Sequence, residues 1–196
     1  MLSPAPPDRI VRVKILADPR IRAANLRWRS DIKEKFSAAA DFFEREFNIL
    51  LVAGEIQPWT LQESVSSTAE LMTYLKKRIP LNDKDGSHDI VIAFTALPGR
   101  ISAGHARVDE IGDCQAGLGN YLAISAIEPL RIGEPESAYG NWDVLTLIHE
   151  LGHLFGAEHV NDRSSIMAVN FNPYTDFDRR NREIILRNKF CPFRKG

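Results

Sequence analysis

Apolar residues in the first half of the chain recur with the periods of strands and helices. An alternating segment at 10–15 and short apolar runs at 49–52 and 89–94 each predict a strand. Apolar positions three and four residues apart predict a long helix over 28–47, and a capping-box spacing predicts the start of a second helix over 67–80. Helices that alternate with strands in this way indicate an α/β layer with mostly parallel pairing.

The second half of the chain predicts shorter elements and a less regular end. Segments 104–109 and 121–127 are short strand candidates, and a helix is expected over 142–155. Beyond Gly156 the apolar periodicity is weak until a last helix that begins near Asp178.

These elements together predict one domain over residues 1–196, of class α/β (α+β). We expect a mixed, mostly parallel five-stranded sheet with two long helices, the helix that precedes Gly156, and a small irregular C-terminal end. The domain is expected to divide into an upper part, 1–156, and a lower part, 157–196. The polar side of the helix over 28–47, which includes Lys35, is expected to face solvent.

The composition excludes several classes of function. The 25 Lys and Arg residues balance 26 Asp and Glu, so no binding of nucleic acid is expected. No apolar run reaches the roughly 18 to 20 residues that a membrane helix requires, so no membrane span is expected. Residues 1–7 lack the features of a signal peptide, but a mature fragment of an exported precursor would look the same. A monomer is expected.

Three of the five histidines fall within the eleven-residue sequence HELGHLFGAEH. On a helix, His149 and His153 lie about 40° apart in projection, so both imidazoles can reach one zinc ion. Glu150 is placed to reach a water at that metal rather than to be a ligand. His159 can join the same metal only if the helix breaks, and Gly156 is the residue at which the backbone can turn.

This segment resembles the zinc-binding signature of the metzincin metallopeptidases. That clan also has a Met-containing turn near its zinc ligands, and Met167, eight residues after His159, is similar to it, although a methionine alone would be read as core filler. The order of the predicted elements is similar as well. The resemblance implies a metzincin-like zincin fold with one catalytic Zn²⁺ held by His149, His153 and His159. It also implies endopeptidase activity, with Glu150 as general base toward a metal-activated water.

Within the clan, the layout most resembles the adamalysin (reprolysin) branch. Cys114 and Cys191 resemble a bridge that ties the C-terminus down in that branch, and two free thiols are the alternative. Such a bridge would favour an extracytoplasmic or secreted location. The sequence departs from the branch at Val160, where adamalysins usually have Asp, and it lacks that branch's other cysteines around the motif.

The resemblance also implies how a peptide or protein substrate binds, since extended peptides lie above the zinc in this clan. The candidate edge strand, which would hold a peptide through backbone hydrogen bonds, comprises Gly104, His105, Ala106, Arg107 and Val108. The pocket for the residue after the scissile bond is expected within 166–174, where Phe171, Pro173 and Tyr174 make it apolar.

Two other functions are compatible with the sequence. One is a catalytically inactive zinc-bearing binding module, but loss of catalysis usually removes the glutamate or a ligand, and all four residues are present. The other is a zinc hydrolase that acts on a non-peptide amide. The third histidine and the downstream methionine argue against it.

Overall fold

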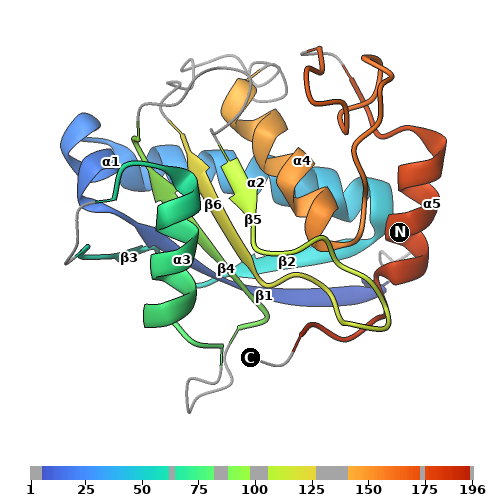
Figure 1. Ribbon diagram of the computed structural model, residues 1–196, viewed down its shortest axis with the longest axis horizontal. Coiled ribbons are helices and arrows are strands. Elements are labelled where there is room, and N and C mark those ends of the chain that lie inside the picture. The colour runs from blue at the N-terminus through green and yellow to red at the C-terminus, as the bar shows by residue number, and fades with distance from the viewer. Residues whose placement is uncertain are drawn as a thin grey trace, which may run out of the picture.

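A largely parallel β-sheet forms the centre of the protein (Figure 1). The structure, a computed structural model, describes residues 6–61, 65–81, 88–97, 106–126, 141–172 and 175–194, and six strands lie within them. Their order is β2-β1-β4-β6-β5, with β3 beside β1; β5 runs antiparallel to β6 and the other pairs are parallel. The bounds are β1 Arg9–Ala17, β2 Ile49–Ala53, β3 Gln57–Pro58, β4 Ile90–Thr95, β5 Ala106–Val108 and β6 Tyr121–Ser125.

The predicted mixed, mostly parallel sheet is confirmed, but its expected number of five strands is corrected to six. The additional strand is β3, in which Gln57 and Pro58 pair with the last two residues of β1. Two exposed residues show no alternation, and proline has no N–H to donate, so no strand pattern marks this segment.

Helices cover both faces of the sheet. The cluster that contains α2 and α4 packs on one face, and α3 packs on the other. None of the described helices is both long enough and apolar enough to cross a membrane. The helix bounds are α1 Pro19–Ala24, α2 Trp28–Phe47, α3 Thr68–Arg78, α4 Trp142–Leu154 and α5 Arg179–Asn188.

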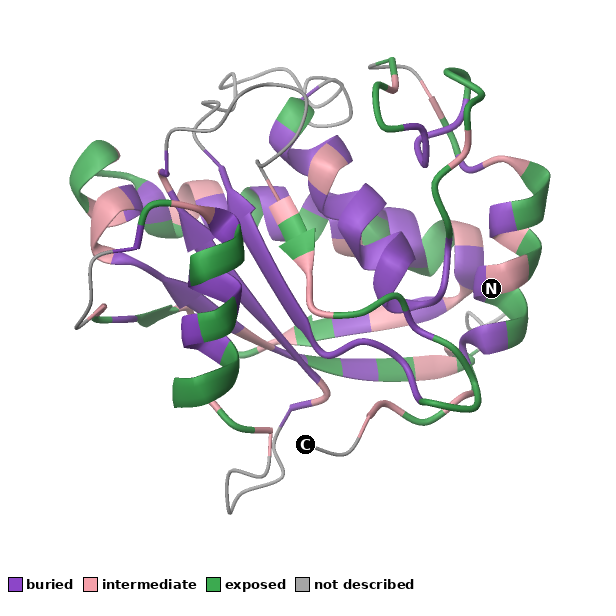
Figure 2. Ribbon diagram, viewed as in Figure 1, coloured by how far each residue is buried: buried purple, intermediate pink, exposed green. Residues whose placement is uncertain are grey.

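Strand β4 shows why its sequence is almost continuously apolar. Ile90, Ile92 and Phe94 belong to the core shared with α2 and α4, whereas Val91 and Ala93 belong to the core beneath α3. Figure 2 shows the strand buried along its length. A strand with core on both faces has no solvent side, so the hydrophobic–polar alternation of a half-exposed strand is absent.

Lys35 of α2 lies inside the protein, which corrects the expectation that it faces solvent. Lys35 is 1% exposed, and its Nζ lies 2.8 Å from Asp143 Oδ2 and 3.7 Å from Asp31 Oδ2. A lysine is buried in this way when carboxylates pair with it. Asp143 is in the first turn of α4, 108 residues away, so the sequence pattern of α2 alone contains no sign of the pair.

Candidate metal centre

Helix α4 presents two of the three histidines. The side chain of Asn141 accepts hydrogen bonds from the N–H groups of Asp143 (3.0 Å) and Val144 (3.3 Å), and so caps donors that the first helical turn leaves unpaired. His149 lies seven residues after Trp142, the first residue of the helix, and His153 lies one turn after His149. Both histidines are buried, and both project from the same side of the helix.

The helix ends at a turn centred on Gly156, whose φ of 96° lies in the left-handed region. The N–H of Gly156 donates to the carbonyl of His153 (2.9 Å), which closes the last turn. A Cβ at this position would lie 2.5 Å from Asn188 Nδ2 and 2.5 Å from the carbonyl oxygen of Gly112. Backbone angle and space therefore both require glycine, and the turn sends the chain back toward the helix, where His159 lies.

The three histidines meet at one point. The distances between their Nε2 atoms are 3.1 Å for His149 to His153, 3.1 Å for His153 to His159 and 3.2 Å for His149 to His159. The Nδ1 of His149 donates to the carbonyl of Ile166 (2.6 Å), and the Nδ1 of His153 donates to the carbonyl of Ala157 (2.6 Å). These bonds place the ring protons on Nδ1 and leave the Nε2 lone pairs directed at one another.

This set of donors fits a zinc ion. Three neighbouring lone pairs repel one another unless a cation lies between them. Tetrahedral zinc with Zn–N distances of about 2.0–2.1 Å separates its ligand nitrogens by roughly 3.3 Å. The observed separations are close to that value. Backbone carbonyls that hold the second ring nitrogen are also typical of histidine ligands.

Burial keeps the three imidazoles neutral. It is the main cause that lowers the pKa of His149 to about 3 and that of His153 to about 4, and it also lowers the pKa of His159. The neutral imidazole is the form that binds a metal, so no proton has to be removed from the three rings at neutral pH.

Glu150 lies between the histidine cluster and the edge strand. Burial raises the pKa of its carboxyl group to about 7, while the charge of Arg107 and a hydrogen bond with the backbone of Val108 lower it. Both of these residues belong to β5, which packs against α4. The structure therefore brings part of the predicted substrate strand to Glu150. Gly104 and His105, also predicted for that strand, lie outside the described residues.

A tight turn places Met167 against α4. The N–H of Ala168 donates to the carbonyl of Ser165 (3.1 Å), and Met167 within this turn is fully buried. Its Sδ lies 3.1 Å from the position that a Cβ on Gly152 would occupy, and its carbonyl accepts the N–H of Val160 (3.1 Å). The turn thus contacts both helix α4 and Val160, the residue directly after His159.

One aromatic ring stacks on His149, and a second packs against the first. Phe171 stacks on His149, with ring centroids 5.6 Å apart and an interplanar angle of 27°. Trp142, at the start of α4, lies 5.6 Å from Phe171 and is 43% exposed. These two rings form an apolar wall beside the cluster. Pro173 and Tyr174, predicted for the same pocket, lie outside the described residues.

Helix α5 contributes two residues that the sequence did not point to. Asn181 hydrogen-bonds the backbone of Glu158, and Asn188 donates to the carbonyl of Phe155 (3.0 Å). Both are buried on the same side of the helix as Ile185, at spacings of four and three. Asparagines at core-facing positions of an amphipathic helix are the signal that could have identified them.

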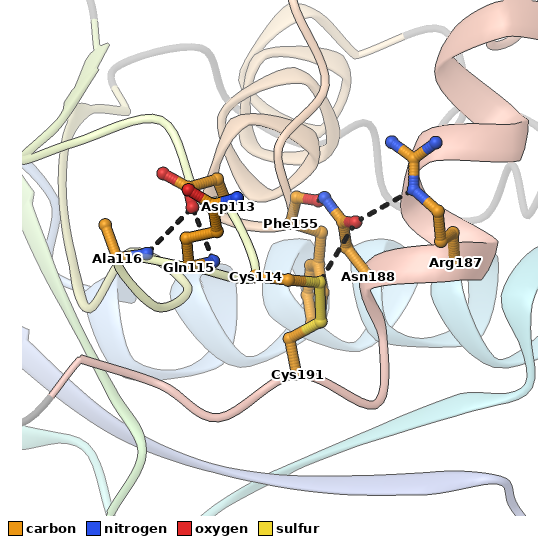
Figure 3. The surroundings of a disulfide bond; sticks show 8 residues. All are labelled: Asp113, Cys114, Gln115, Ala116, Phe155, Arg187, Asn188 and Cys191. Atoms are coloured by element: carbon orange, nitrogen blue, oxygen red, sulfur yellow. Dashed lines mark hydrogen bonds between the residues drawn. A yellow bond between two sulfur atoms is a disulfide. The ribbon is translucent and has the colours of Figure 1, made fainter.

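A disulfide bond joins Cys114 to Cys191 beside this region (Figure 3). Their Cα atoms are 5.2 Å apart, and Oδ1 of Asn188 lies 3.4 Å from Cys114 Sγ. The bond therefore ties the segment after β5 to the segment after α5, next to the residue that holds the end of α4.

A groove of about 650 Å³ lies elsewhere, between α2 and β2. Buried Phe36 and Leu51 and exposed Lys33 and Glu44 are among the residues that line it. None of the three histidines lines this groove, so we do not assign it as the candidate catalytic cleft.

The chain matches a known protein family over most of its length. The model of metallo-peptidase family M12 matches residues 7–186. The chain belongs to this family. A 62-residue part, 32% of this family M12 chain, is 40% identical to matrix metalloproteinase-16 of Rattus norvegicus and of Homo sapiens. The match spans about a tenth (10%) of the length of these relatives.

Two solved structures show the same fold as this family M12 chain. Archaemetzincin from Methanopyrus kandleri superposes with a TM-score of 0.59 at 21% identity, over 91% of this chain and 94% of that one. Metalloproteinase-II from Bacteroides fragilis gives a TM-score of 0.55 at 15% identity, over 93% of this chain and 53% of that one. The predicted family resemblance and the predicted mixed α/β fold are confirmed.

Substitution of Gly156 by alanine tests the end of helix α4 in this family M12 chain. We expect Gly156→Ala to lower the free energy of unfolding by about 1–3 kcal/mol, because the left-handed backbone and the two close contacts both oppose a Cβ. Gly54→Ala is the matched control, since a Cβ there meets nothing within 4 Å. Urea denaturation measures both variants. Equal stability of the two would show that the turn does not require glycine.

Proposed function

We propose that this protein is a zinc-dependent endopeptidase. The observation that supports it most is the convergence of three Nε2 atoms within 3.1–3.2 Å of one another, with a buried carboxyl group on the next residue of the same helix. Three neutral imidazoles form the donor set of a catalytic rather than a structural zinc site, because the fourth position stays open. Membership of a metallopeptidase family supports the same reaction.

Zinc bound by the three histidines would act as a Lewis acid that polarises a peptide carbonyl and acidifies water. Glu150 is the group on this chain that would move the proton. Its carboxylate would accept a proton from the attacking water and deliver it to the leaving amine. In the metal-free chain burial raises the pKa of this group to about 7, and the positive charge of bound zinc would lower it, which favours the ionised form that accepts the proton.

We propose that the substrate is a peptide bound in extended form along β5. This strand ends the sheet order and is antiparallel to β6, so its outer edge is the side on which another strand could add. Arg107 and Val108 of the strand interact with Glu150, which would bring the scissile bond to the proton acceptor. Residues before Gly156 supply two ligands and the base, and residues after it supply His159, so the cleft would lie between the two parts of the chain.

The location of the protein is part of the proposal. A disulfide bond between Cys114 and Cys191 persists in an oxidising compartment, and cytosolic proteins seldom keep one. This supports an extracytoplasmic site of action.

Replacement of Glu150 by glutamine separates catalysis from metal binding. Glu150→Gln keeps the shape of the side chain but cannot accept the proton, so we expect peptidase activity to fall by about 10²–10⁴-fold with zinc content unchanged. Glu44→Gln, at an exposed site on α2, is the control and is expected to keep full activity. For both variants, metal analysis measures the zinc content, and the rate of hydrolysis of an unstructured protein measures the peptidase activity. A zinc-loaded wild type without hydrolysis would favour a binding module.

The aromatic wall predicts the preferred residue after the scissile bond. Phe171, which stacks on His149, and Trp142, which packs against Phe171, favour an apolar side chain there. Phe171→Ser is expected to reduce kcat/KM for such substrates about tenfold, because it removes a partly buried apolar contact. Cleavage of a peptide library by wild type and variant measures the preference. Preference of the wild type for acidic residues at that position would contradict this prediction.

A further inference from the structure

The side chain of Asn181 holds the residue before the third histidine at two points. Its Oδ1 accepts the N–H of Glu158 (2.8 Å), and its Nδ2 donates to the carbonyl of Glu158 (3.0 Å). Asn181 has no exposed surface, so water does not compete for these bonds. Both backbone groups of Glu158, directly before His159, are therefore fixed by one side chain of α5.

The third histidine depends on its backbone more than the other two. His149 and His153 lie on helix α4, and the imidazole ring of each is also held by a hydrogen bond from its Nδ1 to a backbone carbonyl. His159 is the most exposed of the three, and its Nδ1 forms no such bond within the described parts of the chain. The backbone on either side therefore holds His159 in place. Glu158 is hydrogen-bonded by the side chain of Asn181, and the N–H of Val160 donates to the carbonyl of Met167.

Asn181 is itself held in place by a network that reaches the second anchor. Its N–H donates to Asp178 Oδ1 (3.1 Å), and its Nδ2 also donates to Asp178 Oδ2 (2.8 Å). The same Oδ2 accepts the hydroxyl of Ser165 (2.6 Å), and the oxygen of Ser165 accepts the N–H of Met167 (3.1 Å). One chain of hydrogen bonds thereby links the residue before His159 to the turn that holds the residue after it.

We propose that Asn181 is a positioning residue of the metal centre, which keeps His159 at its ligand position through the backbone of Glu158. This inference rests on the proposed function, because it requires that His149, His153 and His159 bind one zinc ion. Asn181 touches neither metal nor substrate, so its effect appears in metal affinity rather than in a chemical step.

Metal affinity of the purified full chain tests this role. Removal of an outer partner of a ligand typically weakens metal binding about 10–100-fold, so Asn181→Ala is expected to lower zinc affinity by that factor in competition with a chelating dye. Asn181→Ser keeps a hydroxyl that can pair with one of the two backbone groups, and is expected to bind with intermediate affinity. The serine variant carries the test if the alanine variant does not fold.

Asn120 provides the matched control. It is also a buried asparagine, and its Nδ2 donates to a backbone carbonyl, that of Asp89 (2.9 Å), away from the histidines. Asn120→Ala is expected to lower the thermal midpoint of the metal-free protein as Asn181→Ala does, and to leave zinc affinity within twofold of wild type. A similar loss of zinc affinity in both variants would overturn the proposal, since general destabilisation would then explain it.

A double substitution shows whether Asn181 acts through His159. His159→Ala removes the third ligand, so adding Asn181→Ala is expected to leave zinc affinity within twofold of that single variant. The absorption spectrum of the cobalt-loaded Asn181→Ala protein should also shift toward that of cobalt-loaded His159→Ala. A further tenfold loss in the double variant would overturn the inference, as would unchanged zinc affinity in Asn181→Ala. Failure of the wild type to bind zinc would instead overturn the proposed function.

Discussion

The end of helix α4 at Gly156 is the constraint on which the proposed metal centre depends. A helix that continued through this residue would carry His159 roughly 15 Å along its axis from His149. The left-handed turn instead returns the chain, so that two histidines ten residues apart, His149 and His159, bring their Nε2 atoms to 3.2 Å. The two helical histidines need only the helix, whereas the third needs this turn and the contacts that fix the residues on either side of it.

Much of the remaining structure braces that helix end. The segment after β5 pairs with it through Gly112, whose N–H donates to the carbonyl of His153 (2.9 Å), and Gly119, whose N–H donates to that of Leu154 (3.0 Å). Asn188 of α5 holds the next carbonyl, and the disulfide joins the two supporting segments beside it (Figure 3). The segment that positions the helix end therefore continues directly from the strand proposed to hold substrate.

The sequence was sufficient wherever a local pattern carries the information. Helix period, the two apolar faces of β4 and the spacing of the histidines predicted the fold, the cluster of three histidines and the turn at Gly156. It was insufficient where contacts are distant in the chain. Three contacts illustrate this. Lys35 pairs with Asp143, β3 adds to β1, and Asn181 hydrogen-bonds the backbone of Glu158. In each case the local sequence around one partner gives no sign of the other.

X-ray absorption spectroscopy of the zinc-loaded protein tests the central claim most directly, because it counts and identifies the ligands. The account predicts three imidazole nitrogens and one oxygen at about 2.0–2.1 Å from the metal, without sulfur. His159→Ala should reduce the imidazole count by one. A wild-type spectrum with two imidazoles, or one that His159→Ala leaves unchanged, would contradict the claim that the turn at Gly156 brings the third histidine to the metal.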